Sequence, residues 1–446
     1  MKKLLALVLA LAMAFALVAC GSEAAAPAAD GANAPAASAV NDGADAADAA
    51  ENNTNDGETA APVEAPAASD IKIGIVLVGD ENEGYTYAHI KGIQDAMATL
   101  GLTDENVTFK YSVPEDENCY DACADFADAG CQLVITNSYG HQTYAQQAAI
   151  DYPNVTFVAC TGDTAKASGL ANFKNAFTGV YESRYVSGVV AGMKVAELVA
   201  ADALSAENYT ADGKVKIGYV GAYPYAEVVS GYTAFFLGIK SVYDNVDMEV
   251  TYTNSWFDIT AEGTAAESLM ADGCVIIGQH ADSTGAPAAV QAASENGTLA
   301  FSVGYNIDML SAAPTAALTS ATNNWGAYYT YAFGCLVNGQ EIDTNWCEGY
   351  NGDAVAITAL GPNVAEGTAE KVAEVEAAIM DGSLHVFDTS TFTVGGAEVT
   401  SAFATDTDGD FVPDTDEAVF DGYYHESFFQ SAPSFSLRID GITELN

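Results

Sequence analysis

The stretch that decides the fold of this 446-residue chain is the apolar run Lys72-Ile73-Gly74-Ile75-Val76-Leu77-Val78-Gly79. It is short and rich in β-branched residues, which is typical of a strand buried on both faces of a parallel sheet. A polar, carboxylate-rich loop follows at residues 80–87, and apolar residues then recur at helical spacing from Ala88 to Leu100. The sequence therefore predicts the start of a βαβ unit, in which ligands are held beyond the carboxyl ends of the strands.

A second copy of this pattern begins at Lys216-Ile217-Gly218-Tyr219-Val220-Gly221, and a polar loop with aromatic residues again follows. A later pair of landmarks also matches, because Gly130-Cys131 and Gly273-Cys274 both precede an apolar strand-like run. The interval from the first strand to this glycine–cysteine step is nearly equal in the two copies. We therefore predict two similar α/β lobes, each about the size of a small domain.

The first 19 residues have the pattern of a signal peptide, with Lys2 and Lys3 before an apolar run that is too short for a comfortable membrane span. They end in Leu17-Val18-Ala19-Cys20-Gly21, which resembles a bacterial lipobox. That resemblance implies that Cys20 is lipidated and holds the mature protein at the cell membrane, on the extracytoplasmic face. An ordinary signal peptide with a chance cysteine is the alternative.

Residues 20–70 contain no aromatic residue, lysine or arginine, and we expect a disordered Ala/Asp-rich tether there. The whole chain carries a formal net charge of −47 and only two arginines, Arg184 and Arg438. A basic patch for nucleic acid is therefore not available, and phosphorylated ligands are disfavoured. The simplest interpretation of the acidity is solubility.

Five or six of the predicted strands end in loops of the same chemistry, in which an aromatic ring stands beside Asp, Asn, Ser or His. Aromatic rings stack on planar ligands, and the polar groups give a pocket its specificity. For single residues a structural role competes with ligand contact: Trp256 suits a core, Asp258 suits a helix N-cap, and His280 suits a buried structural histidine. The candidate ligand-binding residues are Glu83, Tyr85, Asn137, Ser138, Tyr139, Trp256, Asp258, His280, Asp282, Tyr305, Asp308 and Trp325.

Four stretches together resemble the basic membrane lipoprotein (PnrA-like) family, the substrate-binding lipoproteins of nucleoside-type ABC transporters. They are the run 72–79 with Glu83-Gly84-Tyr85, then 137–141, 254–258 and 319–329. The resemblance covers about residues 71–396 and implies the type I periplasmic-binding fold, with two doubly wound parallel-sheet lobes and a ligand cleft between them. It also implies an ABC permease and ATPase as partners and a purine nucleoside or base as ligand.

The same resemblance implies roles for individual residues. Tyr85 resembles the stacking aromatic residue of the first lobe, Trp256 and Asp258 resemble contacts from the second lobe, and Asp308 resembles a polar contact. The first loop of the family commonly has Asn-Asp before its aromatic residue, whereas this chain has Asn82-Glu83. We expect the first lobe at residues 71–175 and about 305–350, the second at about 176–304 and about 351–400, and a C-terminal extension at 401–446.

The extension contains an acidic turn whose spacing is that of a Ca²⁺-binding loop. Its glycine, Gly409, is misplaced for an EF-hand, and the order of residues is closer to a thrombospondin type 3 repeat. A solvated acidic turn is the alternative to a calcium site, and we expect no required cofactor. The candidate calcium ligands are Asp406, Asp408, Asp410, Asp414 and Glu417.

Other functions stay open at this point. The chain has no Gly-x-Ser-x-Gly elbow, no P-loop and no His-Glu-x-x-His motif, so we do not expect an enzyme. Sugars also bind by stacking and by hydrogen bonds to carboxylates, which makes a sugar-binding ABC lipoprotein an alternative. A surface adhesin-like lipoprotein is a further alternative.

Overall fold

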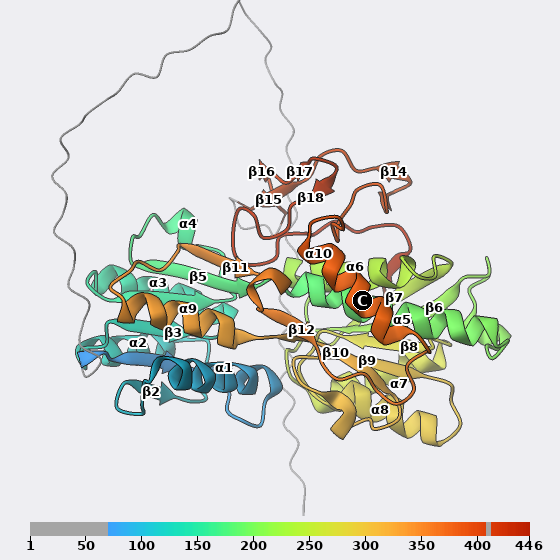
Figure 1. Ribbon diagram of the computed structural model, residues 1–446, viewed down its shortest axis with the longest axis horizontal. Helices are drawn as coiled ribbons and strands as arrows, with labels where there is room; N and C mark the ends of the chain where they lie inside the picture. The colour runs from blue at the N-terminus through green and yellow to red at the C-terminus, as the bar shows by residue number, and fades with distance from the viewer. Residues whose placement is uncertain (1–69, 407–411) are drawn as a thin grey trace, which may run out of the picture. The chain divides into compact units, whose positions relative to one another are not determined.

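The computed structural model describes residues 70–406 and 412–446. The described residues do not include the signal peptide, the lipobox cysteine Cys20, the tether up to residue 69, or the candidate calcium ligands Asp408 and Asp410. The described residues form two α/β lobes, each built on its own sheet with helices on both faces (Figure 1).

The first sheet has six parallel strands in the order β11-β5-β4-β3-β1-β2. Helices α1 and α9 pack on one face, whereas α2 and α3 pack on the other. The bounds are β1 (Ile73–Val76), α1 (Gly84–Leu100), β2 (Val107–Lys110), α2 (Glu117–Asp128), β3 (Leu133–Thr136), α3 (Gln142–Asp151), β4 (Thr156–Cys160), α4 (Ala165–Ser168), β5 (Phe173–Thr178), α9 (Trp325–Val337) and β11 (Asn345–Glu348).

The second sheet has seven strands in the order β12-β10-β9-β8-β6-β7-β19, and all its pairs are parallel except β10 with β12. Helices α5, α6 and α10 cover one face, and α7 and α8 cover the other. The bounds are α5 (Val180–Ala200), β6 (Val215–Gly221), α6 (Ala226–Lys240), β7 (Val246–Tyr252), α7 (Ile259–Ala271), β8 (Ile276–Gln279), α8 (Gly285–Glu295), β9 (Phe301–Tyr305), β10 (Ala317–Asn323), β12 (Val355–Ile357), α10 (Thr368–Met380) and β19 (Ile442–Glu444).

The two sheets share one strand order, because β2-β1-β3-β4-β5 in the first corresponds to β7-β6-β8-β9-β10 in the second. The predicted strands 72–79 and 216–221 supply β1 and β6, which occupy equivalent central places. Gly130 and Gly273 both have positive φ, 84° and 96°, and each follows the helix that precedes β3 or β8. The repeat seen in the sequence is thus a repeat of topology.

Close helix packing explains several glycines that the strand pattern alone does not. A Cβ atom on Gly188 of α5 would lie 2.1 Å from the carbonyl oxygen of Phe235, and one on Gly238 of α6 would lie 2.1 Å from that of Tyr185. Side chains at these two positions would push α5 and α6 apart. The chain needs the two glycines to bury this helix pair against the second sheet.

Two boundaries differ from those expected. Helix α1 begins at Gly84 and not near Ala88, because the carboxylate of Glu83 accepts hydrogen bonds from the backbone of Tyr85 and Thr86 and so caps the helix. The return to the first lobe comes between Asn323 and Trp325 and not near residue 305, because β9 and β10 pair within the second sheet. The chain also passes from one lobe to the other after β5 and between β11 and β12.

The C-terminal extension is part of the packed structure. Its last strand, β19, pairs in parallel with β7 at the edge of the second sheet, and Ser431 donates a hydrogen bond to the carbonyl of Gly162 in the first lobe (3.3 Å). Three small hairpins precede β19. They are β13 (Thr393–Val394) with β14 (Ala397–Glu398), β15 (Phe403–Thr405) with β16 (Thr415–Glu417), and β17 (Val419–Phe420) with β18 (Tyr423–Tyr424).

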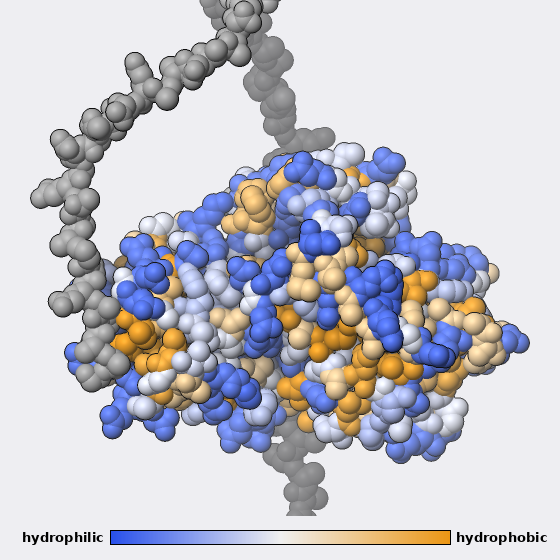
Figure 2. Space-filling view, viewed as in Figure 1, coloured by the Kyte–Doolittle hydropathy of each residue, from blue (hydrophilic) through white to orange (hydrophobic). Residues whose placement is uncertain are grey.

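Hydrophilic side chains cover much of the face seen in Figure 2 and separate smaller apolar groups. Within the described ranges, no helix is long and apolar enough to cross a membrane. The cysteines of the described residues are free thiols, and all except Cys347 are buried.

Candidate ligand-binding site

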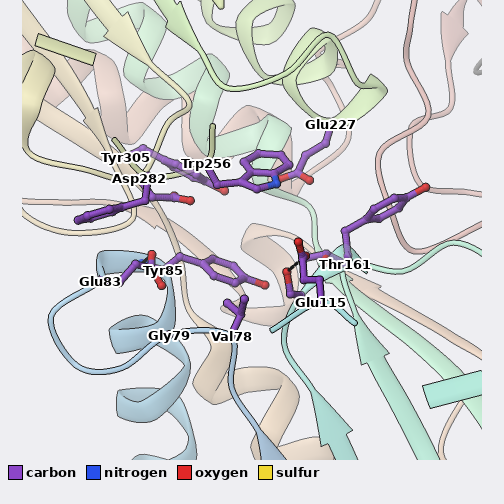
Figure 3. Close-up of a pocket in the computed structure, with 13 residues that line it drawn as sticks. Val78, Gly79, Glu83, Tyr85, Glu115, Thr161, Glu227, Trp256, Asp282 and Tyr305 are labelled. Atoms are coloured by element: carbon purple, nitrogen blue, oxygen red, sulfur yellow. Dashed lines mark hydrogen bonds between the residues drawn. The ribbon is translucent and has the colours of Figure 1, made fainter. Parts of the chain in front are cut away.

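A cavity of about 230 Å³ lies between the two lobes (Figure 3). Its walls come from the carboxyl ends of β1 to β4 in the first lobe and of β6 to β9 in the second, which is where ligands are held in open α/β sheets. Seven candidate residues line it, and they are Glu83, Tyr85, Ser138, Tyr139, Trp256, Asp282 and Tyr305. The other lining residues are Val78, Gly79, Glu115, Thr161, Glu227 and Phe257.

Tyr85 enters the cavity from the first turn of α1, and Figure 3 shows its ring pointing toward the centre from the first lobe. Its hydroxyl donates a hydrogen bond of 2.5 Å to the carbonyl of Asn137, and the ring packs edge-on against His89 with centroids 4.6 Å apart. These contacts fix the direction of the ring before any ligand arrives. Preorganised rings stack on a planar ligand at low entropic cost.

Asn137 and Trp325 lie behind this wall and do not line the cavity. Asn137 accepts a hydrogen bond from the backbone of Val78 (2.8 Å) through Oδ1. Trp325 is 1% exposed and stacks on His89 with centroids 4.1 Å apart. Both side chains therefore support the wall from the core of the first lobe.

Trp256 faces Tyr85 from the second lobe, in the loop after β7 (Figure 3). Its ring contacts Tyr223 edge-on at 5.4 Å, and its carbonyl accepts a hydrogen bond from the backbone of Asp282 (2.8 Å). The first of these contacts orients the ring, and the second ties its loop to the loop after β8. Two aromatic rings from opposite lobes thus border one small cavity.

Asp258 and Asp308 lie outside the cavity wall and cap helices. Asp258 accepts hydrogen bonds from the backbone of Thr260 and Ala261 at the start of α7. Asp308 accepts one from Leu310 (2.8 Å) at the start of a short 3₁₀ turn. In the structure Asp258 therefore has the helix-capping role, which was the structural alternative to ligand contact in the sequence analysis.

His280 is buried directly behind the wall, and its Nε2 lies 3.4 Å from Oε1 of Glu227. Burial lowers the pKa of His280 well below its ordinary value, and the nearby Arg184 lowers it further. The imidazole is therefore neutral at physiological pH. It does not act as a cation in the site.

Three of the four carboxyl groups that line the cavity have raised pKa values. Burial raises the pKa of Glu83, and backbone hydrogen bonds from Tyr85 and Thr86 oppose the rise. Burial raises the pKa of Glu227 to about 7, against the opposing effect of Arg184. Burial, together with the charges of Glu83, Glu262 and Glu227, raises the pKa of Asp282 well above its ordinary value. The cavity is thus rich in hydrogen-bond acceptors and resists further negative charge.

Sequence reasoning missed Glu227, although the internal repeat carries a signal for it. Glu83 follows the loop after β1, and Glu227 follows the equivalent loop after β6 at the start of α6. Glu115 was also missed. Its carboxylate accepts hydrogen bonds from Ser138 Oγ (2.5 Å) and the backbone of Gly140 (3.0 Å), and so joins the loops after β2 and β3. No sequence pattern marked that pairing.

A second cavity of about 330 Å³ adjoins the first and shares Tyr139, Thr161, Glu227 and Trp256 with it. Its far side is lined by residues between 404 and 438. The C-terminal extension therefore borders the cleft on one side.

The proposed calcium site stays a prediction, because Asp408 and Asp410 lie outside the described residues. Glu417 already accepts hydrogen bonds from Ser401 and from the backbone of Ala402 and Val419. In the part of the chain that the structure describes, no group of three His, Cys, Asp or Glu residues is placed to hold a metal ion. Calorimetric titration of the metal-stripped protein with Ca²⁺ is the direct test.

The two lobes and the cavity between them define a binding protein of the periplasmic class. Residues 71–386 match the family model described as ABC transporter substrate-binding protein PnrA-like. A purine-binding protein of Brucella abortus is 31% identical over 324 residues, which cover 72% of this chain and 85% of that protein. A putative ABC transporter glucose-binding protein of Haloferax volcanii is 29% identical over 343 residues, which cover 76% and 80% of the two chains.

A solved ABC transporter solute-binding protein from Aeropyrum pernix K1 has the same fold, with a TM-score of 0.56 at 17% identity over 71% of this chain and 93% of that one. The chain belongs to the PnrA-like family of ABC transporter substrate-binding proteins. The expected fold and family are thus confirmed. The family is a solute-binding transporter component and not an enzyme family, and as such a component the protein acts outside the cytoplasm with a small-molecule ligand and a permease as partners.

Proposed function

We propose that this protein binds a purine nucleoside or purine base in the cavity between its lobes and delivers it to the permease and ATPase of an ABC importer. The observation that carries the proposal is the pair of rings from opposite lobes, Tyr85 and Trp256, beside the carboxyl groups of Glu83, Glu227 and Asp282. Stacking of a base on an aromatic ring contributes roughly 1–3 kcal/mol. The carboxyl groups accept hydrogen bonds from ribose hydroxyls or base N–H groups.

The charge of the cavity favours a nucleoside over a nucleotide. Among the described residues, no lysine or arginine lines this cavity. A phosphate group placed near Glu83, Glu227 and Asp282 would be repelled by any of these groups that is ionised, and no lysine or arginine side chain lines the wall to contact it. The purine-binding relative from Brucella abortus supports the same class of ligand.

A sugar is the second candidate, and two observations favour it. The relative from Haloferax volcanii is named as a putative glucose-binding protein. Rings and carboxylates also suit a monosaccharide, whose hydroxyls donate to carboxylates while its apolar face stacks. We rank the purine first because rings from both lobes, Tyr85 and Trp256, border the cavity.

Mass spectrometry of the small molecule that co-purifies with the protein tests this choice. We expect a purine nucleoside or base in the wild-type sample and a much smaller amount with Trp256→Ala purified in parallel. A hexose present in stoichiometric amount, with no purine, would overturn the proposal in favour of the sugar.

We further propose that the ligand draws the two lobes together, because only a closed cleft lets Tyr85 and Trp256 contact one ligand at once. Solution scattering should show a smaller radius of gyration with saturating ligand than without it. An unchanged radius at saturation would count against closure.

The proposal includes a lipid anchor at Cys20, which rests on the lipobox pattern of the sequence. Expression of Cys20→Ser should release the protein from the membrane fraction of the cell. Equal membrane association of the wild type and the variant would contradict lipidation.

A further inference from the structure

Arg184 is a buried cation directly behind the ligand cavity. It lies on α5, is 2% exposed, and is one of only two arginines in a chain of net charge −47. Its guanidinium carbon lies 3.7 Å from the ring centroid of Tyr305, a cavity residue, and Nη1 donates a hydrogen bond to the carbonyl of Gln279. Removing such a group from water costs several kcal/mol, so its place in the core needs an explanation.

The fold alone does not provide one. Among the ion pairs formed by the described residues, none joins Arg184 to a carboxylate. By contrast Lys194, the other buried cation of α5, pairs with Glu197 on the same helix. Arg184 is therefore held by the Tyr305 ring, the carbonyl of Gln279 and the nearby hydroxyl of Tyr219, and its charge is left to act on the surrounding groups.

The titratable groups that interact with Arg184 come from both strands and helices of the second lobe. The loop after β8 supplies His280, the start of α6 supplies Glu227, β6 supplies Tyr219, and β9 supplies Tyr305. Across the cleft, Tyr85 and Glu83 face Glu227 and Asp282. The side chain of Glu227 retains 17% exposure and lines the cavity.

We infer that Arg184 is a positioning residue for the ligand: its guanidinium fixes the Tyr305 ring at the cavity wall, and it stands behind the hydrogen-bond acceptor that Glu227 presents to the ligand. This inference rests on the proposed function, since it assigns Glu227 to a neutral ligand that carries N–H or O–H donors. A cation–π contact in a dry environment is strong enough to hold a ring in one orientation.

The titration behaviour of the groups around Arg184 supports this assignment. Burial raises the pKa of Glu227 to about 7, and Arg184 is the influence that opposes the rise. The neutral His280 beside Glu227 cannot replace that charge, because burial and Arg184 both lower its pKa. Without Arg184, burial would act on Glu227 unopposed and the pKa of the carboxyl group would rise further.

The first experiment follows the Glu227 carboxyl group by NMR in ligand-free protein, with its signal assigned by its loss in Glu227→Gln. The variants are Arg184→Met and Arg184→Gln, which remove the charge, and Arg184→Lys, which keeps it. Lys194→Met on the same helix is the matched control. We expect the titration midpoint of Glu227 to rise by about 1 pH unit or more in the two variants that lack the Arg184 charge. In Arg184→Lys and Lys194→Met the midpoint should stay near the wild-type value.

The second experiment titrates adenosine calorimetrically into the same proteins, from about pH 6 to about pH 9. We expect affinity at pH 7 to fall by about fivefold or more in Arg184→Met and to recover at higher pH, where Glu227 ionises again. The inference would be overturned if the Glu227 titration midpoint were the same in the wild type and in a folded neutral variant. Either Arg184→Met or Arg184→Gln can serve as that variant. Absence of adenosine binding to the wild type at every pH would contradict the proposed function instead, while the NMR midpoints would still decide the role of Arg184.

Discussion

Asn306 donates a hydrogen bond of 2.7 Å from Nδ2 to Oδ1 of Asp282, and so ties a carboxyl group of the cavity wall to the crossing between the lobes. Asn323, at the end of β10, donates in turn to Oδ1 of Asn306 (2.8 Å) and accepts a hydrogen bond from the hydroxyl of Thr178 at the end of β5. Both of these strands end where the chain passes from one lobe to the other. One chain of hydrogen bonds therefore connects the candidate site to the hinge.

Replacement of Asn306 by glycine tests this connection. Asn306 has φ 61°, a conformation that glycine adopts without strain, so the change removes the side chain and leaves the backbone intact. We expect a loss of about 1–2 kcal/mol in the free energy of unfolding, because Asp282 loses its donor, together with weaker ligand binding. Asn254→Gly is the control, since Asn254 also has positive φ (55°) but is exposed. Equal urea midpoints for the two variants would show that the hydrogen bond contributes nothing.

Trp256→Ala should weaken the binding of purine nucleosides and free purine bases alike. The variant removes one of the two opposed rings, and we expect each ligand to lose roughly 1–3 kcal/mol of binding free energy. Tyr87→Ala is the control, because Tyr87 lies on α1 but is 47% exposed and does not line the cavity. Calorimetric titration with adenosine and adenine measures both effects, and an unchanged affinity in Trp256→Ala would remove Trp256 from the site.

Asp258→Ala should destabilise the protein without changing its choice of ligand. The carboxylate caps α7, and loss of such a cap costs about 1 kcal/mol of stability. Asp258→Asn keeps a capping side chain and should leave the unfolding free energy nearly unchanged. If Asp258→Asn instead weakened the binding of nucleosides more than the binding of free bases, this result would show that Asp258 contacts the ribose.

The unfolding free energy should fall as the pH rises from mildly acidic to alkaline values. Burial raises the pKa of Glu426 from 4.5 to about 8, so the folded state holds this proton more tightly than the unfolded chain does. The resulting stabilisation is fully present below about pH 4.5 and is lost as the pH passes through about 8. Glu227 and Glu262, whose pKa values burial raises to about 7, act in the same direction.

Urea denaturation across this range should show a decrease of roughly 5 kcal/mol or more for the wild type and a smaller one for Glu426→Gln. Glu370→Gln, on the exposed face of α10, should behave like the wild type. The measurement is made in about 0.5 M salt, because salt screens the repulsion between surface carboxylates. Parallel curves for the wild type and Glu426→Gln would rule out this source of the pH dependence.

The fold was predictable because its deciding signals are local. The buried runs of β1 and β6 and the glycine–cysteine steps before β3 and β8 each fall within a few residues, and their repetition indicated two lobes. The late crossing at Asn323 was not predictable, since it depends on β10 pairing with β9 inside the second sheet, and no local pattern shows to which sheet β10 belongs. The same holds for β19, which joins the edge strand β7 from the other end of the chain.

The candidate site was only partly predictable for a related reason. Asp258 and Asp282 both follow strands and look alike in the sequence, yet one caps a helix while the other lines the cavity. Trp256 and Trp325 likewise both follow strands, yet one lines the cavity while the other is buried at the start of α9. Packing between elements decides which side chains reach the cavity. Arg184 is the clearest example, because nothing near it in the sequence indicates that it contacts Tyr305.

The measurement that tests the account most directly is calorimetric titration of the ligand-free wild-type protein with adenosine, adenosine monophosphate and glucose. We predict saturable binding of adenosine at one site per chain, with much weaker binding of the monophosphate and of glucose, because rings and acceptors surround the cavity and no cation lines it. Binding of the monophosphate as tightly as adenosine, or of glucose without any purine, would contradict the account.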